Sequence, residues 1–444
     1  MKQPFKALDE QKIRLFHWRI VITAGMGFFT DAYDLFIIGV VTALLVPLWH
    51  LTTVQLSLLN GAALASAALG ALLFGRLADQ FGRKMMYGFE VLILFVGAIL
   101  SAVSPSYTVL LISRILVGFG VGGDYPTSAV VTSEYANRKN RGFLVLLVFG
   151  MQALGLIIGP LFASLLLDLQ LAPNIVWRVL LGFGAIPAAS VFYLRRRLAE
   201  TPRFLLTKKS PVEVSRVVSD ITNVEGTDIL GRFQPQKLFS RKWLPCLIGT
   251  AGAWFLMDIA FYGNGVSSVL IMDKISPHAS LLRHTLLSAL IFMCFAVPGY
   301  VLAAKYVDRI GRKTLQMMGF FVMGACYAII GLIPAVRDIV PLFILVFGLS
   351  FFFVNFGPNS TSFLIPSEIY PTNIRASGHG ISAAVGKVGA FIGAFCLPFI
   401  LISQGLAMTM GLIAAVSFLG IFITLLIPEM KGISLDASEI PSDI

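Results

Sequence analysis

The sequence predicts an all-α polytopic membrane protein with twelve transmembrane helices in two pseudo-symmetric six-helix halves. Three observations support this prediction: the composition, the number of long apolar segments and a repeat between the two halves. Of the 444 residues, 57% are hydrophobic and only 13% are Asp, Glu, Lys or Arg. Soluble domains carry roughly 25% charged residues, because polar groups must cover their surface. The composition therefore excludes a water-soluble globular protein and a disordered chain.

A transmembrane helix needs about 20 largely apolar residues to cross the hydrocarbon core. Segments that meet this requirement are continuous rather than alternating, which favours helices over a β-barrel. We expect spans at 20–47, 54–78, 85–104, 107–134, 143–168, 176–196, 243–272, 281–304, 314–334, 339–365, 376–402 and 405–427. A long polar stretch separates six spans from six. We therefore divide the chain into an N-terminal half (1–196), a linker loop (197–240) and a C-terminal half (241–444).

The basic residues predict the orientation of these spans, because short loops rich in Lys and Arg stay on the cytoplasmic side. Of the 34 Lys and Arg residues, 28 fall on the side of the termini and the linker, four on the opposite side, and Arg114 and Lys387 inside spans. We expect both termini and the linker in the cytoplasm and the protein in the plasma membrane. Arg195 to Arg197, with Lys208 and Lys209, are expected to form a basic patch at the membrane surface. The net charge of +11 then reflects topology rather than a nucleic-acid partner.

The two halves repeat each other at an offset of about 230 residues. Asp79–Lys84 matches Asp308–Lys313, and Glu200 matches Glu429 at the same offset. A charged turn with a glycine between two helices can pair its Asp and Arg side chains with helix ends and hold one gate state. For a single copy, a topological anchor with a turn is the alternative. The candidate gating residues are Asp79, Arg83, Glu134, Arg141, Asp308, Arg312, Glu368 and Arg375.

These turns also resemble a known family. Gly75–Lys84, its second copy, the Glu200-Thr-Pro-Arg203 segment and Pro428–Gly432 are similar to signatures of the major facilitator superfamily, over nearly the whole chain. The resemblance implies the major facilitator fold and a transporter. It names no substrate.

Gly118, Gly120 and Gly123 satisfy the pattern GxGxxG, which is typical of dinucleotide sites when it follows a strand. Here the glycines lie inside an apolar run of membrane-spanning length, so we expect them to let helices approach closely. Together with Asp124-Tyr125-Pro126, this segment resembles the phosphate:proton symporter family. Four further stretches carry the same resemblance: Gly27–Phe36, Trp254–Gly263, Asn355–Asn359 and His379–Lys387.

Seven ionisable residues fall within the predicted spans: Asp31, Asp34, Glu90, Arg114, Asp124, Asp258 and Lys387. Each would cost roughly 2.5 to 3.5 kcal/mol at a lipid-facing position near the midplane. We therefore expect them to line a pathway through the protein. A carboxylate can accept a hydrogen bond from dihydrogen phosphate, and a protonated one no longer repels an anion. Proton-coupled transport of an anion is consistent with this set.

The resemblance assigns roles to these residues and to neutral donors beside them. It implies a phosphate site formed by Asp124, Tyr125, Gln152, Trp254, Asp258, Tyr262 and Asn355. It implies proton coupling through Asp31, Asp34, Glu90 and Asp124, with Arg114 and Lys387 as compensating cations. Alternatively, Trp254 and Tyr262 form one aromatic helix stripe, and Gln152 makes a hydrogen bond between helices.

The expected function is proton-coupled uptake of inorganic phosphate by alternating access. The alternatives are a proton-coupled symporter of another small solute (a sugar, an aromatic acid or an organic ion) and a nutrient sensor that binds without transporting. We expect no enzyme, metal or cofactor, because the five histidines and four cysteines show no metal-binding spacing. The expected partners are phosphate, protons and the lipid bilayer, with no nucleic acid, and the expected state is a monomer.

Overall fold

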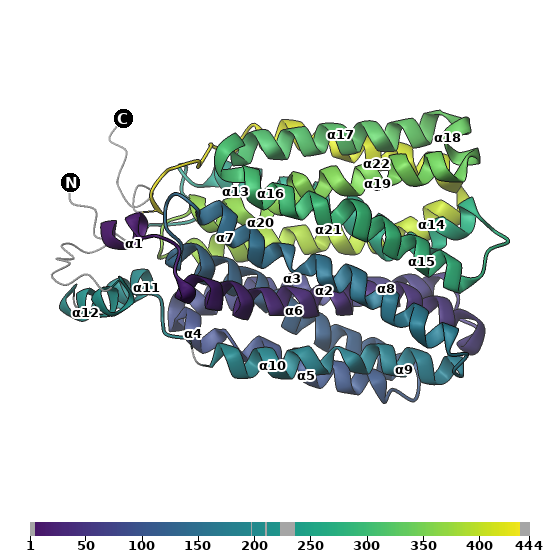
Figure 1. The fold of residues 1–444 in the computed structure, drawn as a ribbon, viewed down its shortest axis with the longest axis horizontal. Helices are drawn as coiled ribbons and strands as arrows, with labels where there is room; N and C mark the ends of the chain where they lie inside the picture. The colour runs from purple at the N-terminus through teal and green to yellow at the C-terminus, as the bar shows by residue number, and fades with distance from the viewer. Residues whose placement is uncertain (1–4, 197, 209–210, 223–235, 436–444) are drawn as a thin grey trace.

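The computed structural model describes residues 5–196, 198–208, 211–222 and 236–435. Arg197 and Lys209 of the predicted basic patch lie outside these residues. In the described chain, twelve helical segments are long and apolar enough to cross a membrane, as the sequence predicts. No strand is present in these residues. The molecule is an elongated bundle in which the first and the last described parts of the chain lie at one end, called here the terminus side (Figure 1).

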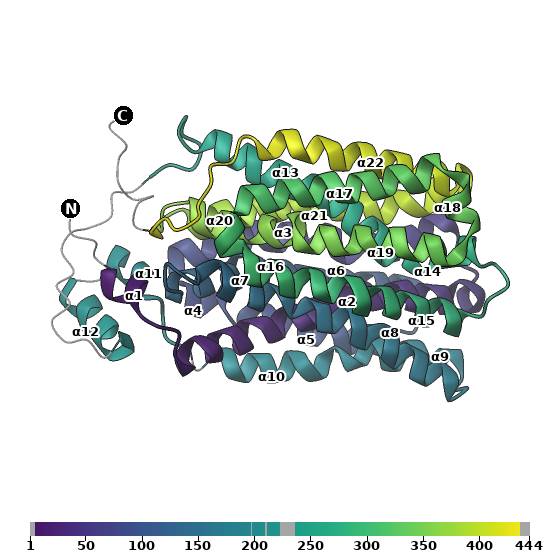
Figure 2. The same ribbon diagram turned by 45° about the horizontal axis from the view of Figure 1, so that its top comes forward.

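Six spans precede the linker and six follow it. Those of the first half are α2 (Leu15–Trp49), α3 (Thr53–Phe81), α4 with α5 (Arg83–Met86, Phe89–Ala102), α6 (Tyr107–Tyr135), α7 with α8 (Arg141–Gly150, Gln152–Asp168) and α9 with α10 (Pro173–Phe183, Ala185–Arg195). Those of the second half are α13 (Leu244–Val266), α15 with η1 and α16 (Leu281–Ile291, Phe292–Ala296, Val297–Ile310), α17 (Arg312–Leu332), α19 with α20 (Val340–Phe356, Pro358–Ile369), α21 (Arg375–Ser403) and α22 (Gly405–Thr424). The first six spans form one bundle and the last six lie beside it (Figure 2).

Short helices cover the two ends of the bundle. The helices α1 (Lys6–Glu10), α11 (Pro202–Lys208) and α12 (Pro211–Thr222) lie on the terminus side, where Phe5, Leu8 and Leu206 share a small apolar core with α12. The helices α14 (Ser268–Ile275) and α18 (Pro334–Asp338) lie at the opposite end (Figure 1).

Some span boundaries differ from the prediction. The span expected at 243–272 ends at Val266 and is followed by the separate helix α14, and the span expected to end at 365 continues to Ile369. Hydropathy misses the last turn of α20 because Ser367 and Glu368 are polar. Both are fully buried by neighbouring helices, so the helix continues beyond its apolar stretch.

The glycines of the GxGxxG pattern lie in α6, and this helix packs against α3. A Cβ atom added at Gly118 would collide with the backbone carbonyl of Ala63 in α3, and one added at Gly120 would collide with that of Glu90 in α5. The prediction that these glycines permit close helix packing is confirmed, and the dinucleotide alternative is wrong because no strand precedes them in the described part of the chain.

The two halves meet along α3 and α21, α7 and α16, and α8 and α15. On the terminus side the first pair is so close that a Cβ atom on Gly75 would lie 3.1 Å from the Cα atom of Gly380. Three spans are interrupted near their middle, at Met151, Gly184 and Gly357. Interrupted helices expose backbone and side-chain polar groups inside a bundle, and Gln152 and Asn355 flank two of these interruptions.

Candidate functional site

A cluster of polar side chains joins the two halves in the middle of the bundle. Lys387 of α21 donates from Nζ to Asp258 Oδ2 and to the Tyr262 hydroxyl of α13, each at 3.0 Å. The Tyr262 hydroxyl lies 3.0 Å from the hydroxyl of Tyr125, which belongs to α6 of the other half. All four residues are buried. The structure thus brings Tyr125, Asp258 and Tyr262 together, as the resemblance implied, and adds Lys387 to them.

The ammonium group of Lys387 is also packed against aromatic rings. Its Nζ atom lies 4.3 Å from the ring centroid of Tyr125 and 4.2 Å from that of Tyr262. Trp254 packs against Tyr125, with ring centroids 5.9 Å apart. Trp254 and Tyr262 therefore do line one face of α13, but this face carries Asp258 and points at Tyr125 and Lys387. The cluster combines one cation, one carboxylate and two hydroxyls, which is a set that can hold a partly protonated anion.

Gln152 and Asn355 are buried beside interrupted helices, but they do not bond to this cluster. Asn355 donates to the backbone carbonyl of Phe351 at 2.6 Å, and its Oδ1 accepts from Asn359 at 2.7 Å. The Nε2 atom of Gln152 has no hydrogen-bond partner among the described residues. The alternative of an interhelical hydrogen bond from this amide is therefore not supported. A buried, unpartnered donor is costly, so this amide is available to a ligand.

The predicted proton-coupling carboxylates divide into two groups. Glu90 and Asp124 share one cation: Arg195 lies 2.9 Å from Glu90 through Nη1 and 2.7 Å from Asp124 through Nη2. Ser128 donates a short hydrogen bond to Asp124. Asp31, Glu90 and Asp124 line a cavity of about 10 Å³, which approaches the room that one water requires. The resemblance places Asp124 in the phosphate site. In the structure its side chain lines this cavity and is not part of the central cluster.

The prediction that Arg195 forms part of a surface basic patch is wrong. Its side chain is fully buried, and its guanidinium lies 4.1 Å from the ring centroid of Tyr87. The sequence placed Arg195 at the end of a span, next to two further arginines, so position alone suggested a loop residue. The buried carboxylates of Glu90 and Asp124 hold it inside, because unpaired charges are not stable there.

Asp34 and Arg114 lie apart from that cavity. Arg114 donates from Nη2 to the backbone carbonyl of Asp34 at 2.7 Å. Both carboxylate oxygens of Asp34 are buried without a hydrogen-bond partner in the described chain, and they face Gly184 at the interruption between α9 and α10. One oxygen of Asp31 and one of Asp258 are also unpartnered there. Such oxygens are positions where a proton would remove the cost of a buried charge.

The eight candidate gating residues form two clusters on the terminus side. In the first, Glu134 of α6 pairs with Arg83 at 3.2 Å and with Arg375, the first residue of α21, at 3.0 Å. Asp79 pairs with Arg83 at 3.1 Å and accepts hydrogen bonds from the backbone amides of Ala376 and Ser377. A carboxylate at a helix N-terminus is favoured by the helix dipole, so Asp79 caps α21 of the opposite half.

The second cluster repeats the first with the halves exchanged. Glu368 of α20 pairs with Arg312 and Arg141, each at 2.9 Å. Asp308 pairs with Arg312 at 2.8 Å and accepts from the backbone amides of Gly142 and Phe143 at the start of α7. The carboxylates of Glu134 and Glu368 are fully buried. These ion pairs and helix caps join the two halves on the terminus side.

Aromatic rings separate the central cluster from these ion pairs. Phe149 and Phe363, from opposite halves, stack with centroids 4.3 Å apart, and Phe28 contacts both Phe363 and Tyr125. At the opposite end of the bundle, α2 and α3 face α13, α14 and α15 across a cavity of about 410 Å³, with Thr42 and Asn60 in its wall. Aromatic rings thus lie between the central cluster and the terminus side, and a cavity lies at the other end of the bundle.

No group of three or more His, Cys, Asp and Glu that could hold a metal ion occurs in the part of the chain that the structure describes. Three residues of the site escaped the sequence interpretation: Arg195, Tyr87 and Ser128. A signal was present for Ser128, since it lies one helical turn after Asp124 and therefore on the same face.

Known proteins resemble this chain over almost its full length. Residues 15–440 match the family model described as "Sugar (and other) transporter". Inorganic phosphate transporter 1-2 of Oryza sativa subsp. japonica is 36% identical over an alignment of 501 positions, which covers 97% of this chain and 94% of that protein. Inorganic phosphate transporter 1-1 of Arabidopsis thaliana is 35% identical over an alignment of 503 positions, covering 97% and 96%.

Among solved structures, a proton:xylose symporter of the major facilitator superfamily, bound to 6-bromo-6-deoxy-D-glucose, superposes with a TM-score of 0.80. The alignment covers 96% of this chain and 98% of that one at 18% sequence identity, a likeness that shows the fold alone. The curated relatives are transporters, and the matches span both halves and the linker. The chain therefore belongs to the major facilitator superfamily and, within it, to the family of the inorganic phosphate transporters.

Proposed function

We propose that this protein takes up inorganic phosphate together with protons, by alternating access of a central site between its two halves. The observation that carries the proposal is the Tyr125–Tyr262–Lys387–Asp258 cluster, in which the hydroxyl of Tyr125 meets the Tyr262 hydroxyl of the other half and the Tyr125 ring meets the Lys387 ammonium. The names of the relatives, all inorganic phosphate transporters, support phosphate as the substrate.

The chemistry of the cluster suits dihydrogen phosphate. The Lys387 ammonium and the two tyrosine hydroxyls donate to phosphate oxygens, while the free Asp258 Oδ1 accepts from a phosphate hydroxyl. The Nε2 atom of Gln152 supplies a further donor. Binding would break the Lys387–Asp258 pair, and phosphate would take its place between the two charges. The bound anion adds one negative charge to the site, which a proton on a nearby carboxylate would offset.

We assign the proton to the carboxylates of the first half. Asp31 faces the cavity shared with Glu90 and Asp124, and its unpartnered oxygen is a natural acceptor. Arg195 forms ion pairs with the other two carboxylates. Protonation of Asp31 would reduce the negative charge beside the phosphate site. Release of this proton to the terminus side would accompany phosphate release. Asp34 with Arg114 forms a second candidate for this route.

We further propose that the terminus side is cytoplasmic, that the protein resides as a monomer in the plasma membrane, and that its two halves, 1–196 and 241–444, rock as units. Most basic residues lie on the terminus side, while Arg178, Lys274, Arg283 and Arg337 lie on helices at the opposite end or adjoining it (Figure 1). In this orientation the gate clusters are the closed cytoplasmic gate, and the cavity near Thr42 opens outward.

Transport into proteoliposomes tests the function. With the outside more acidic than the inside, radiolabelled phosphate should accumulate in vesicles that contain the wild-type protein, and a protonophore should abolish the accumulation. Asp258→Asn should prevent uptake, whereas Asp338→Asn, an exposed carboxylate on α18, should not.

Other outcomes assign the protein differently. Accumulation of xylose or another solute in place of phosphate would support the alternative symporter. Phosphate binding without exchange of labelled for unlabelled phosphate across the membrane would support a sensor.

A further inference from the structure

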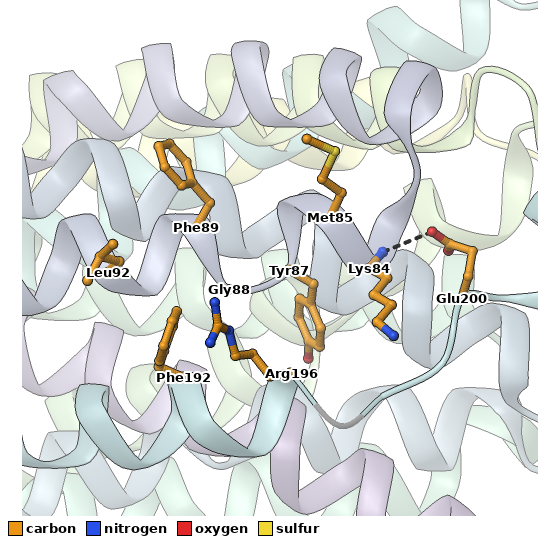
Figure 3. A pocket seen from close by; sticks show the side chains of 9 residues that line it. All are labelled: Lys84, Met85, Tyr87, Gly88, Phe89, Leu92, Phe192, Arg196 and Glu200. Carbon is orange, nitrogen blue, oxygen red and sulfur yellow. Dashed lines mark hydrogen bonds between the residues drawn. The ribbon is translucent and has the colours of Figure 1, made fainter.

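A pocket of about 610 Å³ lies on the first half, at the terminus-side edge of the membrane-spanning region. It is bounded by the turn after α3, the start of α5 and the end of α10. Figure 3 shows Phe89, Leu92 and Phe192 toward one end of the pocket and Lys84 and Glu200 toward the other, with Arg196 and Tyr87 between them. The pocket therefore has an apolar end and a charged end.

The apolar end faces the surrounding hydrocarbon. Phe89 and Leu92 are 58% and 44% exposed, and they stand on the outer face of α5. The charged end lies where spans begin and end, because Arg83 starts one span and Arg195 ends another. This depth is the level of lipid headgroups.

Two cations of the pocket are available to a ligand. Lys84 and Arg196 are exposed. Among the described residues, their side-chain nitrogens have no hydrogen-bond or ion-pair partner. The guanidinium of Arg196 only packs over Phe192, 4.9 Å from its ring centroid.

The third charge of the pocket, Glu200, is satisfied by the protein. Its carboxylate accepts from the backbone amides of Lys84 at 3.1 Å and Thr201 at 2.9 Å. Burial raises the pKa of this carboxyl, so it repels an anion less than a free carboxylate would. The pocket thus presents a positive end.

The internal repeat supplies a comparison. Lys313 and Glu429 of the second half form the same turn as Lys84 and Glu200, since the Lys313 amide donates to Glu429 at 3.0 Å. However, Leu425 stands at the position that corresponds to Arg196, and its carbonyl accepts from Lys313 Nζ at 3.0 Å. In the second half, a leucine thus replaces one of the two cations, and the ammonium of the other donates to a backbone carbonyl. The turn itself therefore does not require two free cations, and the first half differs from it in a way that favours an anion.

We propose that this pocket binds an anionic phospholipid, with the headgroup phosphate between Lys84 and Arg196 and an acyl chain along Phe89, Leu92 and Phe192. Basic side chains above an apolar wall match the two ends of such a lipid, whereas free phosphate would use only the charged end. The Tyr87 ring lines this pocket and also contacts Arg195, so bound lipid lies one side chain away from the ion pairs of Arg195 with Glu90 and Asp124.

Photolabelling of the full chain in vesicles tests the proposal. The vesicles consist of phosphatidylcholine with a small fraction of phosphatidylglycerol that carries a photoactivatable acyl chain. We expect the label on the segments that contain Phe89 and Phe192, and we expect unlabelled phosphatidylglycerol to displace it. Lys84→Gln combined with Arg196→Gln should lower this labelling at least about fivefold. Lys313→Gln, the corresponding change in the second half, should leave it unchanged.

Three results would overturn the proposal. One is equal labelling of these segments by a phosphatidylcholine probe with the same acyl chain, which is measured on the wild-type protein and does not depend on the variants. Another is unchanged labelling in the double variant. The third is displacement of the lipid probe by inorganic phosphate, which would identify a site for the free anion.

Discussion

Arg195 Nη2 lies 2.7 Å from Asp124 Oδ2, and this contact joins the last turn of α10 to the middle of α6. The same guanidinium reaches Glu90 on α5 at 2.9 Å, so three spans of the first half converge on one cation. Removal of one partner from a buried ion pair costs about 3 to 5 kcal/mol, because the remaining charges lose their compensation. Arg195 is therefore the residue on which the charge balance of this half depends.

Replacement of Arg195 by Gln should reduce phosphate uptake at least about tenfold, because Glu90 and Asp124 would each need a proton to remain buried. Arg195→Lys should restore part of the activity, since it keeps the charge but cannot reach both carboxylates with a fork of two N–H groups. The measurement is the initial rate of uptake as a function of external pH. Arg309→Gln, an exposed arginine of α16, is the control. Uptake by Arg195→Gln equal to that of this control would contradict the role.

Tyr262→Phe should raise the KM for phosphate about tenfold or more while the protein remains folded. The substitution removes the hydroxyl that contacts both Lys387 Nζ and the Tyr125 hydroxyl, and a hydrogen bond to a charged group is worth about 1.5 to 3 kcal/mol. Uptake kinetics over a range of phosphate concentrations measure the change. Tyr306→Phe, at a lysine-covered ring on α16, should behave as wild type. An unchanged KM would place phosphate elsewhere.

Glu134→Gln should open the terminus side. The carboxylate of Glu134 pairs with Arg83 of its own half and with Arg375 of the other, so its loss removes the negative charge that links these two buried cations across the halves. Distances between spin labels at Lys139 and Lys431, one in each half, should lengthen and broaden. Glu10→Gln, which removes only an exposed pair with Lys6, should leave the distribution unchanged. An unaltered distribution in Glu134→Gln would show that other contacts close this gate.

Gly122→Ala should destabilise the protein by about 1 to 3 kcal/mol, because its Cβ atom would meet the backbone of Ala67 and push α6 away from α3. Gly411 of α22 is the matched position, since a Cβ atom there meets nothing within 4 Å. Gly411→Ala should be neutral or slightly stabilising, as alanine is the better helix former. Thermal unfolding of the two variants in detergent measures the difference, and equal melting temperatures would argue against close packing at Gly122.

The sequence by itself determined the number of spans and the division into halves. These properties follow from local hydropathy, because the bilayer selects apolar segments of fixed length. The candidate gating residues could also be identified from the sequence. The repeat of Asp79–Lys84 at Asp308–Lys313 predicted that the two turns are structurally equivalent. In the structure, Asp79 and Asp308 each cap a helix of the other half.

Only the tertiary structure decided which charges meet. Lys387 and Asp258 are 129 residues apart and pair at 3.0 Å, and Arg195 pairs with two carboxylates instead of lying at the membrane surface. Hydropathy reports whether a residue is apolar, but not the direction in which its side chain leaves the helix or which helix packs there. The partner of a buried charge is set by helix packing between segments far apart in the chain, so the sequence supplied the charges and the fold paired them.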